Sequence, residues 1–328
     1  MKRFFAALLL LTAFLTGCGS KQPIQTEMFA MDTVMQLKIW SEETGLDAVR
    51  EEINRLDRLL SVTDETSELF ALNRDGYAVL SEETASLLRK AIALSERTGG
   101  AFDPTVYPLV LAWGFTTDSQ AVPTDAAREK ALSVLGTEHI HFSGNTVTLD
   151  AGSMLDFGAI AKGYAAQCCA DLLRARGVTA ALLSLGGNVQ TVGTKPDGSA
   201  WAVGISDPKN PSQAIATLEF YGEKALVTSG SYQRYFEADG KKYHHILDPE
   251  TGAPANHGLA SVTVIADSGT LADAYSTALF VMGMEKAEKF WSEHPDFEAV
   301  FLLETGEIFA TEGAAALLRD CEVTVIKR

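Results

Sequence analysis

Residues 180–193, AALLSLGGNVQTVG, place two apolar segments on either side of a Gly-Gly pair. The segments 180–185 and 189–193 have the length and apolar content of buried strands. The chain then continues with further strand candidates at 201–206, 214–220, 224–228, 232–238 and 242–247. Strands that follow one another without regularly alternating helices argue against a doubly wound parallel sheet. The sequence therefore predicts an α+β fold with mixed or antiparallel sheets and packed helices.

Helices are predicted on both sides of this strand-rich region from apolar spacing and capping residues. The expected helices cover 47–60, 81–98, 124–135, 157–175 and 269–282. The expected remaining strands are one at 28–40, a hairpin at 140–149, one at 261–266, two near 298–310 and one at 322–327. The region from 61 to 80 is predicted to be a loop. No internal repeat or long linker interrupts the chain, so we expect a single large domain over 28–328.

The N-terminal segment has the features of a bacterial lipoprotein signal. A basic start and a short apolar run lead into Leu-Thr-Gly-Cys at 15–18, the pattern of a secretory signal that ends at a cysteine. The apolar run is too short to span a bilayer. We therefore expect a signal peptide at 1–17, a lipidated Cys18 that begins a tether over 18–27, and a location outside the cytoplasm on a bacterial membrane. The alternatives are an ordinary cleaved signal and an uncleaved anchor.

The chain of 328 residues is acidic, with a formal net charge of −16. Such a charge repels nucleic-acid phosphate, so no nucleic-acid partner is expected. A phosphate-ester substrate would then need positive charge supplied locally, by a metal ion or a few placed cations. Cys168, Cys169 and Cys321 show no metal-ligand spacing. They are predicted to be small buried apolar residues, with a disulfide from Cys321 to one of the pair as the alternative.

Three oxygen-bearing side chains lie in LADAYSTAL on a predicted helix. Asp273, Ser276 and Thr277 share a face, because positions i, i+3 and i+4 are neighbours on a helix surface. One carboxylate with hydroxyl oxygens suits Mg²⁺, which uses few protein ligands. A capped and solvated helix start is the alternative.

Two further motifs carry candidate chemistry. DFGAIAKG at 156–163 joins a hairpin to a helix, where free backbone NH groups and Lys162 attract phosphate; an ordinary capped helix is the alternative. His244 and His245 adjoin each other in a strand, so one faces inward as a candidate proton shuttle or phosphate donor. A surface histidine beside a core histidine explains the pair equally well. The motifs HExxH, GxSxG and GxGxxG are absent, which removes the usual support for zinc protease, α/β-hydrolase and Rossmann functions.

Taken together, the motifs resemble those of the ApbE family, the FAD:protein FMN transferases, many of which are bacterial lipoproteins. The resemblance runs from about 31 to 280. Its blocks occur in the family's order: MDTVM, SELFALN, GAFDPTVYPLVLAWGF, DFGAIAKGYA, LGGNV, WAVGISDP, TSGSYQRYF, HHILDPETG and ADAYSTALF.

The resemblance implies an α+β enzyme that binds FAD and Mg²⁺. Such an enzyme transfers the FMN half of FAD to a threonine hydroxyl of an acceptor protein through a phosphoester bond and releases AMP. Acceptors in the family include subunits of sodium-pumping NADH:quinone oxidoreductases and Rnf-type complexes. Two further functions fit the same residues: an FAD pyrophosphatase that gives FMN and AMP, and a non-catalytic FAD-binding lipoprotein.

The family motifs also imply the site residues. The metal would be held by Asp273, Thr277, Ser276 and the carbonyl of Ala159. The FAD site would be lined by Met31, Ala101, Phe102, Asp103, Asp156, Lys162, His245 and Ile246. His245 and Asp273 are expected to be the catalytic residues, with the general base left open among His245, Asp273 and Asp156. One departure is the loop Ser-Val-Thr-Asp at 61–64, where some members carry a tyrosine over the flavin.

Overall fold

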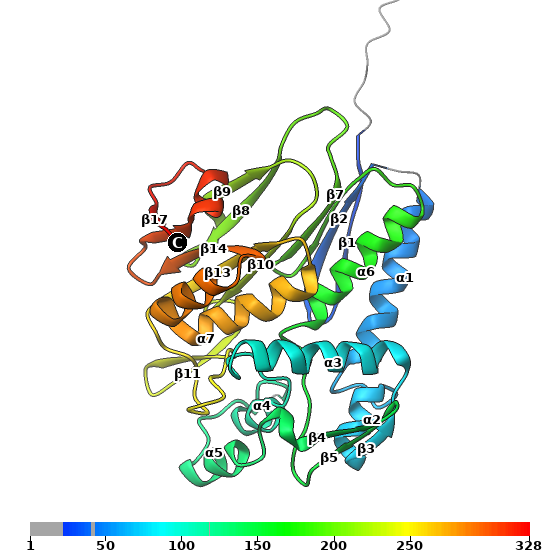
Figure 1. Ribbon diagram of the computed structural model, residues 1–328, viewed down its shortest axis with the longest axis vertical. Coiled ribbons are helices and arrows are strands. Elements are labelled where there is room, and N and C mark those ends of the chain that lie inside the picture. The colour runs from blue at the N-terminus through cyan, green and yellow to red at the C-terminus, as the bar shows by residue number, and fades with distance from the viewer. Residues whose placement is uncertain (1–21, 41–42, 118) are drawn as a thin grey trace, which may run out of the picture.

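A nine-stranded sheet forms the centre of the computed structural model (Figure 1), which describes residues 22–40, 43–117 and 119–328. Neighbouring strands are antiparallel except β15 and β17, which are parallel. This arrangement confirms the α+β class predicted from the sequence. The strands, in order across the sheet, are β1 (Ile24–Ala30), β2 (Thr33–Ile39), β6 (Ala180–Leu185), β7 (Asn188–Gly193), β10 (Ala225–Gly230), β13 (Leu259–Ala266), β14 (Phe297–Leu303), β15 (Ile308–Thr311) and β17 (Thr324–Ile326).

The two faces of the sheet are covered differently. One face packs against α1 (Glu43–Leu60), α6 (Ala161–Ala175) and α7 (Gly269–Glu293). Much of the other face packs against a three-stranded sheet of β16 (Leu318–Arg319), β9 (Asn210–Phe220) and β8 (Trp201–Asp207). All eight residues of β13 are buried, as expected for a strand covered on both sides.

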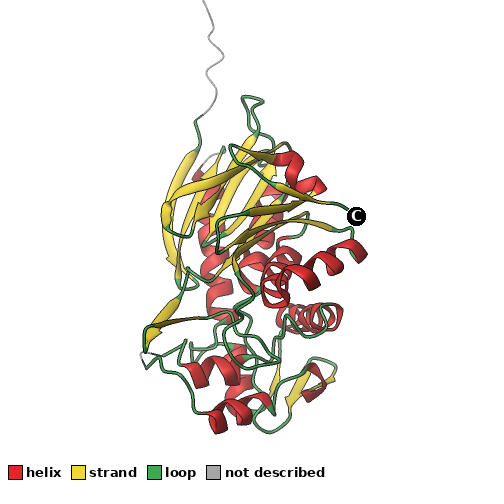
Figure 2. Cartoon of the chain, turned by 90° about the vertical axis from the view of Figure 1, so that its left-hand side faces the viewer, coloured by secondary structure: helices red, strands yellow, loops and turns green. Residues whose placement is uncertain are grey.

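Shorter elements occupy the lower half of the molecule, where helices and loops predominate (Figure 2). Ser81 and Thr124 cap α3 and α5 by accepting hydrogen bonds from Thr84 and Ala127, which confirms both predicted helix starts. The elements are α2 (Glu68–Asp75), α3 (Glu82–Arg97), α4 (Tyr107–Trp113), α5 (Asp125–Leu132), the small sheet β3 (Tyr77–Val79), β5 (Thr146–Leu149) and β4 (Ile140–Ser143), and the hairpin β11 (Tyr235–Ala238) and β12 (Lys241–His244). A 3₁₀ turn at Thr137–His139 and α8 (Glu312–Leu317) complete the fold.

The single strand predicted over 28–40 is wrong, because the chain turns back at Met31 and Asp32. These two residues have φ of 48° and 57°, and Ala30 pairs directly with Thr33. A two-residue turn with positive φ at both positions matches the twist of a hairpin. No glycine, proline or asparagine stands at this turn, so the usual residue signals of a hairpin are missing.

The predicted flexible tether over 18–27 is also corrected, because 24–27 belong to β1. The expected signal peptide at 1–17 and the lipidated Cys18 lie outside the described residues. Among the residues that the structure describes, no helix has the length and apolar character needed to cross a membrane.

The predicted loop between 61 and 80 contains α2 and β3. Ser67 caps α2 by accepting a hydrogen bond from the Leu69 amide at 3.1 Å, and this short helix buries only Leu69 and Leu72. A stretch with so few buried positions shows little helical periodicity. Cys168, Cys169 and Cys321 are free thiols, so the alternative of a disulfide from Cys321 is not realised.

Candidate active site

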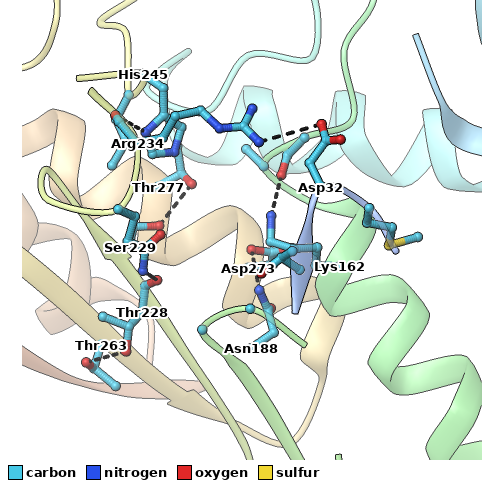
Figure 3. Close-up of a pocket in the computed structure, with 18 of the residues that line it drawn as sticks. Asp32, Lys162, Asn188, Thr228, Ser229, Arg234, His245, Thr263, Asp273 and Thr277 are labelled. Atoms are coloured by element: carbon cyan, nitrogen blue, oxygen red, sulfur yellow. Dashed lines mark hydrogen bonds and ion pairs between the residues drawn. The ribbon is translucent and has the colours of Figure 1, made fainter. Parts of the chain in front are cut away.

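A cavity of about 700 Å³ brings together nearly all of the site residues implied by the family motifs (Figure 3). They reach it from the β1–β2 turn, the loop after α3, the start of α6, the segment after β12, and α7. The cavity is lined by Met31, Ala101, Phe102, Asp103, Asp156, Ala159, Lys162, His245, Ile246, Asp273 and Thr277. Residues more than 240 positions apart in the sequence therefore share one site. Ser276 is not among the residues that line the cavity.

Asp273 is a buried carboxylate in this cavity, only 3% exposed. One of its oxygens accepts a hydrogen bond from the Gly163 amide at 2.8 Å, and the other lies 3.4 Å from the Asn188 amide nitrogen. Burial raises the pKa of Asp273 above its ordinary value. Among the described residues, no lysine, arginine or histidine forms an ion pair with it. A buried carboxylate without a cationic partner is unfavourable unless a cation joins it.

The oxygens around Asp273 fit a hard divalent cation. Thr277 lies one helical turn further along α7 and also lines the cavity. Ala159 lines the same cavity from the loop before α6. The side-chain oxygen of Asn188 is buried with no hydrogen-bond partner in the described part of the chain. Carboxylate, hydroxyl and carbonyl oxygens are the donor set of Mg²⁺.

Ser276 is buried behind the residues that line the cavity, next to Ser229, which does line it. Its hydroxyl donates to the Asp273 carbonyl at 2.9 Å and lies 2.8 Å from the Ser229 hydroxyl. The residue is fully buried. The structure therefore places Asp273 and Thr277 at the cavity and Ser276 in the contact between α7 and β10.

Gly163 allows α6 to approach α7 closely enough to place Asp273. A Cβ at this position would lie 2.2 Å from the Gly269 carbonyl oxygen and 2.6 Å from the Asp273 Cβ. The amide at the start of α6 therefore reaches the carboxylate directly. The Gly163 amide donates its hydrogen bond to Asp273. It is therefore not one of the free backbone NH groups that the sequence suggested for phosphate binding.

Substituting Gly163 with alanine should separate the two helices. We expect Gly163→Ala to lower the free energy of unfolding by about 1–3 kcal/mol, because overpacking forces backbone shifts. The same change should weaken Mg²⁺ binding, because Asp273 moves with α7. Urea denaturation and a Mg²⁺ titration measure the two effects. Ala175→Val, at an exposed position of α6, is the control; equal effects of the two variants would contradict the packing explanation.

Lys162 and Asp156 line the cavity on either side of the start of α6. The Lys162 ammonium donates to the Gly158 carbonyl at 3.0 Å, and the Asp156 carboxylate accepts from the Gly158 amide at 2.7 Å. Burial raises the pKa of Asp156 and that of Asp103. The arrangement keeps a lysine at the cavity while fixing the backbone of the DFGAIAKG loop.

His245 lines the cavity, whereas His244 packs away from it. The Nδ1–H of His245 donates to the Arg234 carbonyl at 3.1 Å, which leaves Nε2 as the unprotonated nitrogen of the neutral ring. Burial lowers the pKa of His245 to about 3, so the ring is neutral at physiological pH. His244 instead bonds the Ala255 carbonyl through Nε2 at 2.9 Å and meets Phe280 edge-on. His245 is therefore the histidine that presents an unprotonated ring nitrogen at the cavity.

Sequence reasoning did not single out several polar residues of the cavity. Asp32, Asn188, Gln233 and Arg234 all line it. Each belongs to a block that the sequence had already marked, namely MDTVM, LGGNV or TSGSYQRYF. The sequence signal for these residues was that several family motifs occur together in one chain. The role of each side chain follows only from its position in the folded structure.

The fold and the cavity together define an α+β protein whose cavity is lined by four aspartates, a lysine and an arginine. The ApbE family model matches residues 31–301. The FAD:protein FMN transferase of Treponema pallidum is 33% identical over 92% of this chain and 91% of its own length, and that of Vibrio cholerae is 36% identical over 74% of each chain. The chain belongs to the ApbE family.

Solved structures agree with this assignment. The ApbE protein of Thermotoga maritima superposes with a TM-score of 0.86 at 35% identity, covering 91% of this chain and all of the other. The flavin transferase ApbE of Vibrio cholerae gives a TM-score of 0.80 at 28% identity and covers 90% of this chain and 99% of its own.

Proposed function

We propose that this protein is a Mg²⁺-dependent FAD:protein FMN transferase that forms a phosphoester between FMN and an acceptor threonine and releases AMP. The observation that carries the proposal is the meeting of three groups in one cavity: the buried carboxylate of Asp273, the ammonium of Lys162 and the neutral imidazole of His245. Within the described ranges of the chain, the Asp273 carboxylate forms no ion pair. The names of the curated relatives support the flavin-transfer chemistry.

Different residues of the cavity would have different roles in such a transfer. The acceptor hydroxyl oxygen forms a bond to the flavin-side phosphorus, and the bond from that phosphorus to the bridging oxygen breaks, so that AMP leaves with the electron pair. His245 Nε2 would take the hydroxyl proton, while its Nδ1–H stays on the Arg234 carbonyl. Lys162 offsets negative charge on the phosphates. Mg²⁺, held by Asp273, Thr277 and the Ala159 carbonyl, would act as a Lewis acid on the phosphate oxygens.

We also propose that the protein works outside the cytoplasm, anchored to a bacterial membrane by lipid on Cys18. The basis is the cysteine-ended signal at 1–18 of the sequence. In that compartment its acceptors would be exposed segments of redox complexes, such as subunits of sodium-pumping NADH:quinone oxidoreductases or Rnf-type complexes. Incorporation of labelled palmitate tests the anchor, with Cys18→Ala as the control. Equal labelling of the two proteins would refute it.

One assay tests the proposed reaction. The full chain is incubated in detergent with FAD, Mg²⁺ and a threonine-bearing acceptor domain, with the Thr→Ala acceptor as the matched control. Covalent flavin on the threonine-bearing acceptor, with one AMP released per flavin attached, supports transfer. Release of FMN and AMP without covalent flavin on the acceptor would show that the protein hydrolyses FAD with water and does not transfer flavin. If the protein binds FAD but leaves it unchanged under all conditions, both reactions are refuted and the protein is a flavin-binding protein without catalytic activity.

A further inference from the structure

The side chain of Arg234 extends towards Asp32 along the lining of the cavity (Figure 3). Its guanidinium lies 3.6 Å from the Asp32 carboxylate, and the two side chains are 42% and 80% exposed. At this distance and exposure an ion pair contributes little to the stability of the fold. Both residues line the main cavity and also the adjoining one of about 650 Å³. The pair therefore lies at the solvent-exposed edge shared by the two cavities, and its contribution to stability does not explain its placement.

The charges of the cavity show what Arg234 adds. The main cavity is lined by four acids and, among the described residues, by two permanent cations, Lys162 and Arg234. The four acids are Asp32, Asp103, Asp156 and Asp273. A pyrophosphate brings further negative charge into this acidic surrounding, so both cations are needed near it. The planar guanidinium also suits the oxygens of a phosphate, because it donates two parallel hydrogen bonds.

The backbone fixes both partners of the ion pair independently. The Arg234 carbonyl accepts hydrogen bonds from the amide and from the Nδ1–H of His245, both at 3.1 Å. Asp32 occupies the β1–β2 turn with a φ of 57°. The side chain of Arg234 is therefore free to change partner while its backbone continues to hold the histidine.

We propose that Arg234 is a substrate-contacting residue that binds the pyrophosphate of the dinucleotide, and that Asp32 competes with the phosphates for its guanidinium. This inference rests on the proposed function, because it takes FAD as the substrate. Binding exchanges one ion pair, Arg234 with Asp32, for another, Arg234 with phosphate. The two residues therefore have opposite effects on affinity, which a purely structural ion pair would not produce.

Equilibrium binding tests this with the full chain in detergent and without added Mg²⁺, so that turnover does not interfere. Arg234→Ala should weaken FAD binding roughly ten- to hundredfold, the contribution of a hydrogen bond to a charged group. Asp32→Asn should strengthen it roughly two- to fivefold, because the competing charge is gone. Asparagine accepts the positive φ of this turn, so the hairpin is preserved. Riboflavin, which has no phosphate, should bind all three proteins alike.

A matched control comes from another loose surface pair. Arg319 lies 3.4 Å from Glu219, with the two side chains 47% and 44% exposed, and Arg319→Ala should leave FAD affinity unchanged. Weaker binding by both Arg234→Ala and Asp32→Asn would overturn the proposal in favour of a structural ion pair, as would equal losses for riboflavin and FAD. If the unaltered protein transfers flavin but Arg234→Ala binds FAD as tightly as the unaltered protein does, this inference is overturned and the proposed function is not. An unaltered protein that binds no FAD would overturn the proposed function as well.

Discussion

Replacing Asp273 by asparagine is expected to reduce flavin transfer about a thousandfold while leaving the fold at least as stable. The carboxylate is buried without a cationic partner among the described residues, and burial raises its pKa. Asparagine removes the charge but keeps an oxygen that can accept from the Gly163 amide. The metal's contribution to charge neutralisation is lost, and electrostatic groups of this kind contribute about two to three orders of magnitude to the rate. Transfer assays with thermal unfolding, each with and without Mg²⁺, measure both effects.

Ser276→Ala is the matched control on the same helix. Ser276 is as buried as Asp273 but does not line the cavity, and its hydroxyl bonds the Ser229 hydroxyl and the Asp273 carbonyl. We expect a loss of about 1–2 kcal/mol in stability with the dependence of transfer on Mg²⁺ intact. A large rise in the Mg²⁺ requirement of Ser276→Ala would instead make Ser276 a ligand. Full Mg²⁺-dependent activity of Asp273→Asn would remove Asp273 from the metal site.

His245→Gln is expected to lower kcat by about two to four orders of magnitude, the contribution of a positioned general base. Glutamine retains hydrogen-bonding capacity but has no basic nitrogen to replace Nε2. FAD affinity should fall much less than kcat, because Lys162 and the cavity walls remain. Single-turnover rates and FAD titrations separate the two effects. His244→Gln is the matched control, because that ring packs against Phe280 and the Ala255 carbonyl; an equal fall in kcat for both variants would contradict the assignment.

The same histidine predicts a dependence of stability on pH. Its pKa is lowered from 6.5 to about 3 in the folded protein, so between these values the unfolded chain binds a proton that the folded chain does not. The stability from neutral His245 is complete above pH 6.5 and is lost as pH falls towards 3, at up to about 1.4 kcal/mol per pH unit. Urea denaturation of the metal-free protein from pH 7 to 4 should show a shallower decline for His245→Gln. Parallel curves would contradict the shift.

Much of the fold follows from local sequence patterns. The elements that the sequence analysis missed also have local causes. Apolar runs such as 180–185 match β6 to the residue, because a strand buried on both faces is continuous and short. The helix predicted over 269–282 matches α7 up to Gly283, where the backbone leaves the helical region. The turn at Met31 and Asp32 escaped notice because no glycine or asparagine marks it. Helix α2 was not predicted because it buries too few residues to show a helical period of apolar positions.

The sequence by itself determined the class of fold, the capped helix starts and the order of motifs that identifies the family. These are properties of neighbouring residues or of a linear pattern. Only the tertiary structure decided that His245 and not His244 reaches the cavity, that Ser276 is not among the residues that line it, and that Arg234 meets Asp32 beside it. The physical reason is that orientation, burial and pKa depend on groups distant in sequence: Gly163 sets the position of Asp273, and the Arg234 carbonyl sets the free nitrogen of His245.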